Sequence, residues 1–233
     1  MKNTTACPIC QTENPFYLSK CENCNTFLKD KVSNIDLWPT FGKLIESPVQ
    51  AFTQIIRSEH KNFIFPILLF ASIKFFIDSI FLLMFLENEE IVFGGFVLNT
   101  LIIFAGLITL VALFSLLLKY TTPIVNTKTR FKDNVAILSY SLILHAIALC
   151  ILFPIELVLF GSYIFSTNPS PFAIKETMAY IMAGFELLIV LWSFSMVVAG
   201  LFTQTRNLLF SLGIAVLFNL AIFYLFFLSG KFI

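Results

Sequence analysis

The first segment long enough to cross a lipid bilayer is NFIFPILLFASIKFFIDSIFLLMFL, residues Asn62 to Leu86. A membrane-spanning helix needs about 20 mostly apolar residues, and this segment meets that requirement. It also carries two charges, Lys74 and Asp78, that hydrocarbon does not tolerate without a partner or water. The residues before Asn62 are polar or amphipathic, and those after Leu86 contain further apolar segments. The orientation of this first segment therefore sets the topology of the chain.

The composition of the 233-residue chain also indicates a membrane protein. Hydrophobic residues make up 58% of the chain and charged residues 12%, whereas a soluble domain has roughly half and a quarter. The formal net charge is +1, and no basic patch is interleaved with aromatic residues. We therefore expect no nucleic-acid partner.

Five apolar segments have the length of a membrane span. They cover residues 63–86, 91–118, 135–160, 178–202 and 207–228. Pro154 lies inside the third segment, where we expect it to kink the helix. We predict an all-α membrane protein, in which residues 62–233 form a bundle of five transmembrane helices.

The head of the chain, residues 1–30, contains four of the five cysteines. Their spacing is C-x2-C-x10-C-x2-C, formed by Cys7, Cys10, Cys21 and Cys24. Each C-x2-C turn directs two sulfurs at one ion, and four thiolates complete a tetrahedral zinc site with no open position for a substrate. Two disulfides or a rubredoxin-like iron site are the alternatives. The segment resembles a short zinc ribbon, except that Gln11 and Asn25 follow the two turns where glycine is usual.

Residues 31–61 form a linker followed by an amphipathic segment. Apolar residues recur at helical spacing between Phe41 and Ile56, and Ser47-Pro48 is a typical helix start. We predict a helix over residues 48–60, preceded by a shorter helical turn near Pro39. We expect this helix to lie along the membrane surface, with packing against the head as the alternative.

The distribution of charge predicts the orientation. With the N-terminus in the cytoplasm, the cytoplasmic segments hold every Lys and Arg except Lys74, Lys175 and Lys231. The opposite side then receives the acidic loop that contains Glu87, Glu89 and Glu90. The positive-inside rule favours this arrangement, which also keeps the cysteines in a reducing compartment. We therefore predict a multi-pass integral membrane protein, in a prokaryotic inner or plasma membrane, with its C-terminus on the other side.

Several polar residues interrupt the apolar segments and define a hypothetical intramembrane polar layer. These residues are Lys74, Asp78, Asn99, His145, Glu186 and Asn219. Lys74 and Asp78 are one helical turn apart, and Glu186 could reach Lys74 from the fourth span. We expect His145 to make a hydrogen bond to a neighbouring helix, and Glu156 to be hydrated near the outer interface. The layer could be a polar pocket, or a set of neutralised pairs that fixes the packing of the helices.

From Glu46 onward the chain resembles the Yip domain family, the Ypt/Rab-interacting membrane proteins. The resemblance lies in SPVQAFTQII (Ser47 to Ile56), in Phe131-Lys132 followed by LSYSLILH, and in Trp192, Gly200-Leu201 and Arg206. A zinc ribbon in front of this domain is similar to prokaryotic members. The resemblance implies a five-helix membrane domain with a cytoplasmic N-terminus. In eukaryotic relatives it implies vesicle trafficking and small GTPases, and it supplies no catalytic residue.

We found no catalytic motif, such as H-E-x-x-H, G-x-S-x-G or a phosphate-binding loop, and we expect no enzyme. The first expectation is a membrane scaffold or adaptor. Its partners would be the lipid bilayer, an unknown protein bound by the cytoplasmic head and a possible second copy of the chain. The alternative is a small-molecule or lipid transporter or channel that uses the polar layer.

Overall fold

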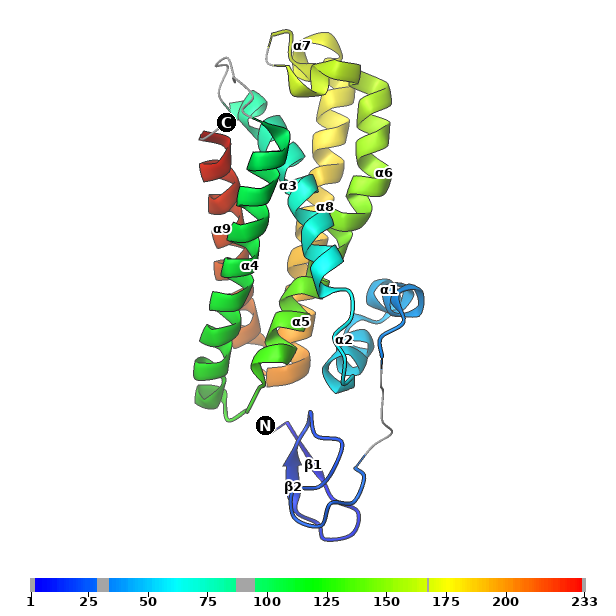
Figure 1. Ribbon diagram of the computed structural model, residues 1–233, viewed down its shortest axis with the longest axis vertical. Coiled ribbons are helices and arrows are strands. Elements are labelled where there is room, and N and C mark those ends of the chain that lie inside the picture. Colours follow the sequence, from blue (N-terminus) through cyan, green and yellow to red (C-terminus); the bar gives the residue numbers. More distant parts are fainter. Residues whose placement is uncertain (1–2, 29–33, 87–94, 167, 232–233) are drawn as a thin grey trace. The chain divides into compact units, whose positions relative to one another are not determined.

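Helices make up most of the computed structural model, which describes residues 3–28, 34–86, 95–166 and 168–231 (Figure 1). The head contains strands β1 (Thr4–Ala6) and β2 (Glu13–Pro15), which pair antiparallel. The helices that follow are α1 (Leu37–Glu46), α2 (Pro48–Arg57), α3 (Ile64–Leu86), α4 (Phe96–Thr121), η1 (Thr122–Val125), α5 (Phe131–Ser141), α6 (Ile143–Phe160), η2 (Gly161–Phe165), α7 (Pro171–Ile174), α8 (Glu176–Thr205) and α9 (Leu208–Lys231).

Five helical segments among the described residues are long and apolar enough to cross a membrane. They cover Ile64–Leu82, Phe96–Val125, Phe131–Phe165, Glu176–Thr205 and Leu208–Leu225. Large apolar side chains are exposed along them, with Val158 86% and Leu209 82% accessible. A soluble protein rarely exposes apolar surface on this scale, whereas hydrocarbon favours it. The predicted five-span, all-α membrane protein is confirmed.

The third span differs from the prediction in where it is interrupted. It begins at Phe131, earlier than residue 135, and its helix breaks at Leu142, where φ is −89° and ψ is 1°. Pro154 lies inside α6 and does not end it. The expected acidic loop at Glu87, Glu89 and Glu90 lies outside the described residues.

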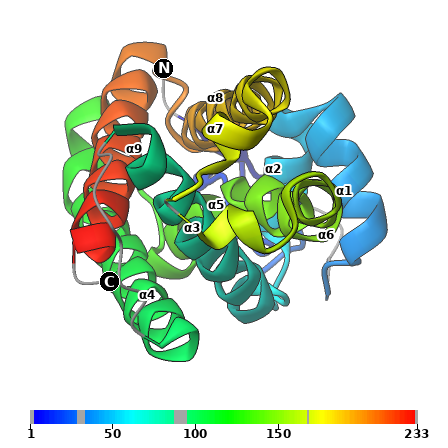
Figure 2. The same cartoon turned by 90° about the horizontal axis from the view of Figure 1, so that it is seen from above.

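The chain divides into two compact units. The first comprises Met1–Ile64, Val111–Ser141 and Ser195–Leu217, and the second comprises Phe65–Leu110, Leu142–Phe194 and Phe218–Ile233. Within each unit the helical segments lie side by side as a bundle (Figures 1 and 2).

In the first unit, the amphipathic segment forms two helices rather than one helix and a short turn. Ala51, Phe52, Ile55 and Ile56 of α2 are buried. Gly200 of α8 lies against Phe52, since a Cβ added there would be 3.2 Å from that ring. The apolar face expected to lie on lipid is therefore covered by the protein's own helices. Trp38 and Ile45 on α1 stay exposed and are large apolar side chains that could contact the membrane surface.

In the second unit, the core described around α6 also involves η2 and α8. Its buried members are Ala148, Leu152, Phe160, Ile164, Ala179 and Met182. A separate cluster of charged side chains lies on α3, α6 and α8.

Candidate functional site

The two cysteine turns of the head have the same backbone geometry. Cys7 donates its N–H to Thr12 O at 3.0 Å, and Cys21 donates to Thr26 O at 2.9 Å. The return hydrogen bonds, Gln11 N to Cys7 O and Asn25 N to Cys21 O, are both 3.0 Å. Gln11 and Asn25 adopt left-handed φ values of 56° and 58°, which is the conformation for which glycine is usual at these positions. Both turns form without glycine, although the left-handed region costs a non-glycine residue about 1–2 kcal/mol.

The four cysteine sulfurs converge on one point. Each Sγ lies within 4.8 Å of the others, and the Cys7–Cys24 and Cys10–Cys21 distances are both 3.5 Å. A disulfide needs a sulfur–sulfur distance of about 2.05 Å, so the four are free thiols here. A tetrahedral ion with metal–sulfur bonds of about 2.3 Å would place the sulfurs roughly 3.8 Å apart. The four cysteines therefore fit a metal ion.

Hydrogen bonds to the sulfurs prepare the site for a cation. The hydroxyl and backbone N–H of Thr12 lower the pKa of Cys10 to about 5. The backbone N–H of Cys24 contributes most to lowering the pKa of Cys21. At Cys7 the N–H of Cys10 also acts to lower the pKa, but burial and the neighbouring sulfurs outweigh it and raise the pKa to about 11. Two sulfurs thus favour the thiolate that binds metal, and metal binding would release the proton of Cys7.

Asn14 is a supporting residue that the cysteine pattern does not reveal. Its side chain is fully buried, and its Nδ2 donates to Thr12 O at 2.8 Å and lies 3.4 Å from the sulfur of Cys21. Its Oδ1 accepts from Glu22 N at 2.9 Å. One amide therefore joins the two cysteine turns, as second-sphere groups do around metal ligands.

The head is attached to the helices of its own unit by aromatic and polar contacts. The guanidinium of Arg57 lies 4.8 Å from the ring centroid of Phe16, and that of Arg130 lies 4.5 Å from Tyr17. Asn3 Nδ2 donates to the carbonyl oxygens of Thr203 and Gln204 at 3.0 and 2.7 Å. These contacts fix the head against α2, α5 and α8.

In the second unit, three carboxylates surround the ammonium group of Lys74. Lys74 Nζ is 2.7 Å from Asp78 Oδ1 and 3.5 Å from Glu156 Oε2, and it also donates to Glu186 Oε1. The Lys74 side chain has no accessible surface, and that of Glu156 has 3%. The structure therefore brings together Lys74, Asp78 and Glu186 of the predicted polar layer.

The environment of Glu156 differs from the prediction. This side chain is buried beside Lys74, although the sequence position suggested a hydrated residue near the outer interface. The reason is that α6 directs this side chain toward α3 rather than toward solvent. Three carboxylates then face one ammonium, so the charges within this cluster do not balance as the sequence suggested.

The other members of the predicted layer are not among the partners described for Lys74. Asn99 on α4 is buried, and Asn219 on α9 is half-buried. The His145 ring is buried against Phe75, with centroids 4.5 Å apart. Its Nδ1 has no hydrogen-bond partner among the described residues, and the expected hydrogen bond of this ring to a neighbouring helix stays a prediction.

Comparison with known proteins finds no family model, no curated protein and no solved structure that matches this chain.

Proposed function

We propose that this chain is a non-enzymatic integral membrane adaptor of the Yip type, whose zinc-binding head lies in the cytoplasm and recruits a protein partner. The observation that carries the proposal is the closed set of four sulfurs on a head that is fixed to its helices. Four protein ligands leave a metal no position for a substrate, which is typical of structural sites. A metal held in this way would fix the fold of the head and so order the surface that a partner contacts.

Zinc is the ion that suits the site best. Four thiolates at tetrahedral separation are the usual ligands of structural zinc, and a reducing compartment keeps them available. Cys7, Cys10, Cys21 and Cys24 would hold the ion. A head of about 30 residues buries too little apolar surface to fold alone, so zinc would supply most of its stability.

The surface of the head suits a protein partner. Ile9, between the cysteines of the first turn, is 70% exposed, and Phe27 is 58% exposed. Exposed apolar side chains on a small polar module are typical of protein–protein contacts. The same surface contains no group arranged for catalysis that we can identify among the described residues.

The test combines metal analysis with crosslinking in the native membrane. We expect about one zinc per purified chain, and loss of that zinc in Cys7→Ser with Cys21→Ser, without loss of membrane insertion. In Ile9→Ser with Phe27→Ser we expect the zinc to remain and the crosslinked partner to be lost. Ile124→Ser removes an exposed apolar side chain outside the head and is the control. A partner retained in the Ile9/Phe27 variant would refute recruitment by this surface.

A second candidate function, transport of protons or small cations, is favoured by the excess of carboxylates around Lys74. Intramembrane carboxylates without matching cations are typical of proton and ion pathways. The test is cation or proton flux into liposomes that contain the purified chain. Flux that disappears in Lys74→Met with Asp78→Leu would support transport, and no flux above empty liposomes would exclude it.

A further inference from the structure

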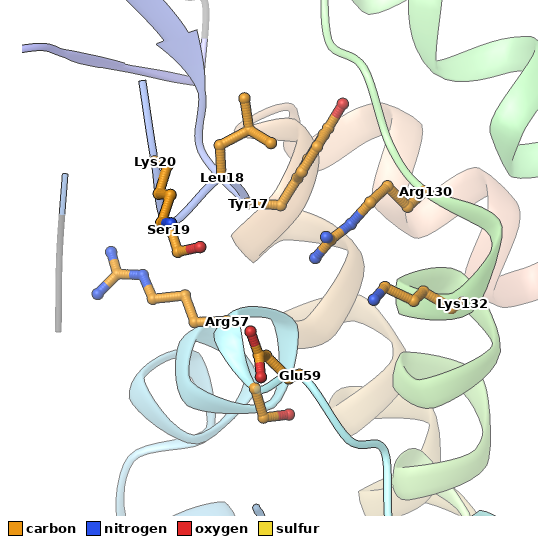
Figure 3. Close-up of a pocket in the computed structure, with 9 residues that line it drawn as sticks. Tyr17, Leu18, Ser19, Lys20, Arg57, Glu59, Arg130 and Lys132 are labelled. Atoms are coloured by element: carbon orange, nitrogen blue, oxygen red, sulfur yellow. The ribbon is translucent and has the colours of Figure 1, made fainter. Parts of the chain in front are cut away.

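A polar cavity of about 210 Å³ lies within the first unit, between three segments that are far apart in the sequence (Figure 3). The head supplies one wall, the end of α2 a second and the start of α5 a third. Its lining includes Tyr17, Lys20, Arg57, Glu59, Arg130 and Lys132. In Figure 3, Arg57 lies on the side of Ser19 and Lys20, whereas Arg130 enters from the segment before α5 and Lys132 from α5 itself.

The walls of the cavity carry an excess of positive charge. Four lining side chains are cations and one, Glu59, is a carboxylate. The adjacent buried Asp133 does not remove the excess, because it already binds Arg130 (Nε to Oδ2, 2.7 Å) and Lys61 (Nζ to Oδ1, 3.1 Å). With Lys61, Asp133 and Glu22, whose charge acts on Tyr17, included, five cations face three carboxylates. A cavity with an excess of positive charge raises the local concentration of anions.

Two arginines of the wall are held in place before any ligand binds. Arg57 stacks on Phe16, and Arg130 stacks on Tyr17 while its Nη2 donates to Ile56 O at 3.3 Å. The Nε of Arg57 is buried and has no acceptor among the described residues. Its burial also lowers the pKa of this guanidinium. The two guanidinium groups therefore keep a fixed position beside the cavity, although the Nε of Arg57, which has almost no accessible surface, would make no contact with a ligand there.

The position of the cavity along the chain places it at the end of two membrane spans. Arg130 directly precedes α5, and Glu59 lies five residues before Ile64, the first residue of α3. Because Arg130 is adjacent to the first residue of its span, this wall of the cavity lies at the level of the lipid headgroups. Phosphate is the anion that is abundant at this level, and arginine is suited to bind its oxygens.

We propose that this cavity binds a phosphate group, carried either by an anionic lipid headgroup or by a soluble phosphate compound. A basic surface that served only to orient the chain in the membrane would carry the same charge. It would not require two arginines stacked on aromatic rings at the walls of one cavity. The proposal is independent of partner recruitment by the head.

The experiment measures binding to the purified full chain in a mild non-ionic detergent. The probes are inorganic phosphate, dihexanoyl phosphatidic acid and, as a zwitterionic comparison, dihexanoyl phosphatidylcholine. The test variant is Lys20→Gln with Lys132→Gln, since both side chains are exposed and their loss leaves the buried contacts intact. The matched control is Lys119→Gln with Lys128→Gln, which removes the same charge from exposed positions outside the cavity.

We expect phosphatidic acid to bind the wild type saturably and at least about tenfold more weakly in the Lys20/Lys132 variant, with the control unchanged. Inorganic phosphate with the same dependence on the variants would identify a soluble phosphate ligand. Phosphatidic acid alone would identify a lipid headgroup. Equal weakening in the two variants, or no saturable binding of either phosphate probe, would overturn the proposal.

Discussion

Lys74 is a buried cation that offsets the charge of three buried carboxylates on membrane-spanning helices. Its ammonium group is fully buried and contacts carboxylates from α3, α6 and α8. We expect Lys74→Met to destabilise the chain by about 3–5 kcal/mol, because it leaves three carboxylates without a cation. Asp78→Asn should cost less, since Lys74 keeps Glu156 and Glu186. Thermal unfolding in detergent measures both values.

The matched control also neutralises the three partners of Lys74. It combines Lys74→Met with Asp78→Asn, Glu156→Gln and Glu186→Gln in one chain. Replacement of a complete buried ion cluster by neutral groups is often tolerated. Recovery of most of the lost stability would show that the cost is uncompensated charge. A Lys74→Met protein as stable as the wild type would contradict the ion cluster itself.

Lys61 should make stability depend on pH. Burial lowers its pKa to about 8, although the nearby Asp133 acts to raise it, and the unfolded value is about 10.4. Between these two pKa values, Lys61 carries a proton in a smaller fraction of folded chains than of unfolded chains. The free energy of unfolding should therefore rise with pH in this window, by up to about 2–3 kcal/mol. The measurement is the difference in unfolding free energy between wild type and Lys61→Gln from pH 7 to 10, which should shift in favour of the wild type as pH rises.

At the scale of the element, the close approach of α2, α5 and α8 depends on Gly200. A Cβ added there would lie 2.5 Å from Cγ2 of Ile137 and 3.2 Å from the Phe52 ring. We expect Gly200→Ala to destabilise by about 1–3 kcal/mol, because the packed helices must separate. Gly184, on the same helix α8, has no heavy atom within 4 Å of an added Cβ, so Gly184→Ala should stabilise by up to about 1 kcal/mol. Opposite signs in thermal unfolding would confirm the prediction, and equal effects would contradict it.

The elements also show what the sequence could predict. Apolar length identified the five spans, and cysteine spacing identified four sulfurs that do converge, because both signals are local. The burial of α2 and of Glu156 was not predictable, since each depends on which distant helix packs against it. The predicted kink at Pro154 stays a prediction, whereas the break at Leu142 was not predictable because no breaker residue lies there.

At the scale of the whole molecule, the five spans found among the described residues predict that the segments before the first span and after the last lie on opposite sides of the bilayer. The positive-inside rule predicts that the head lies in the cytoplasm, because Arg57, Lys61 and the basic residues before α5 all fall on its side. The loop between η1 and α5 should share that side. The loop before α7 should lie on the other.

This topology predicts the reactivity of two introduced cysteines with a membrane-impermeant thiol reagent in intact cells. Asn168→Cys, before α7, should be labelled from outside, whereas Asn126→Cys, after η1, should be labelled only when the membrane is opened. The wild-type chain gives the background from its own five cysteines. The reverse pattern would invert the orientation and move the four head cysteines out of the reducing compartment, where disulfides rather than a metal would be expected. Labelling of both from outside would mean that the span between them, Phe131–Phe165, does not cross the membrane.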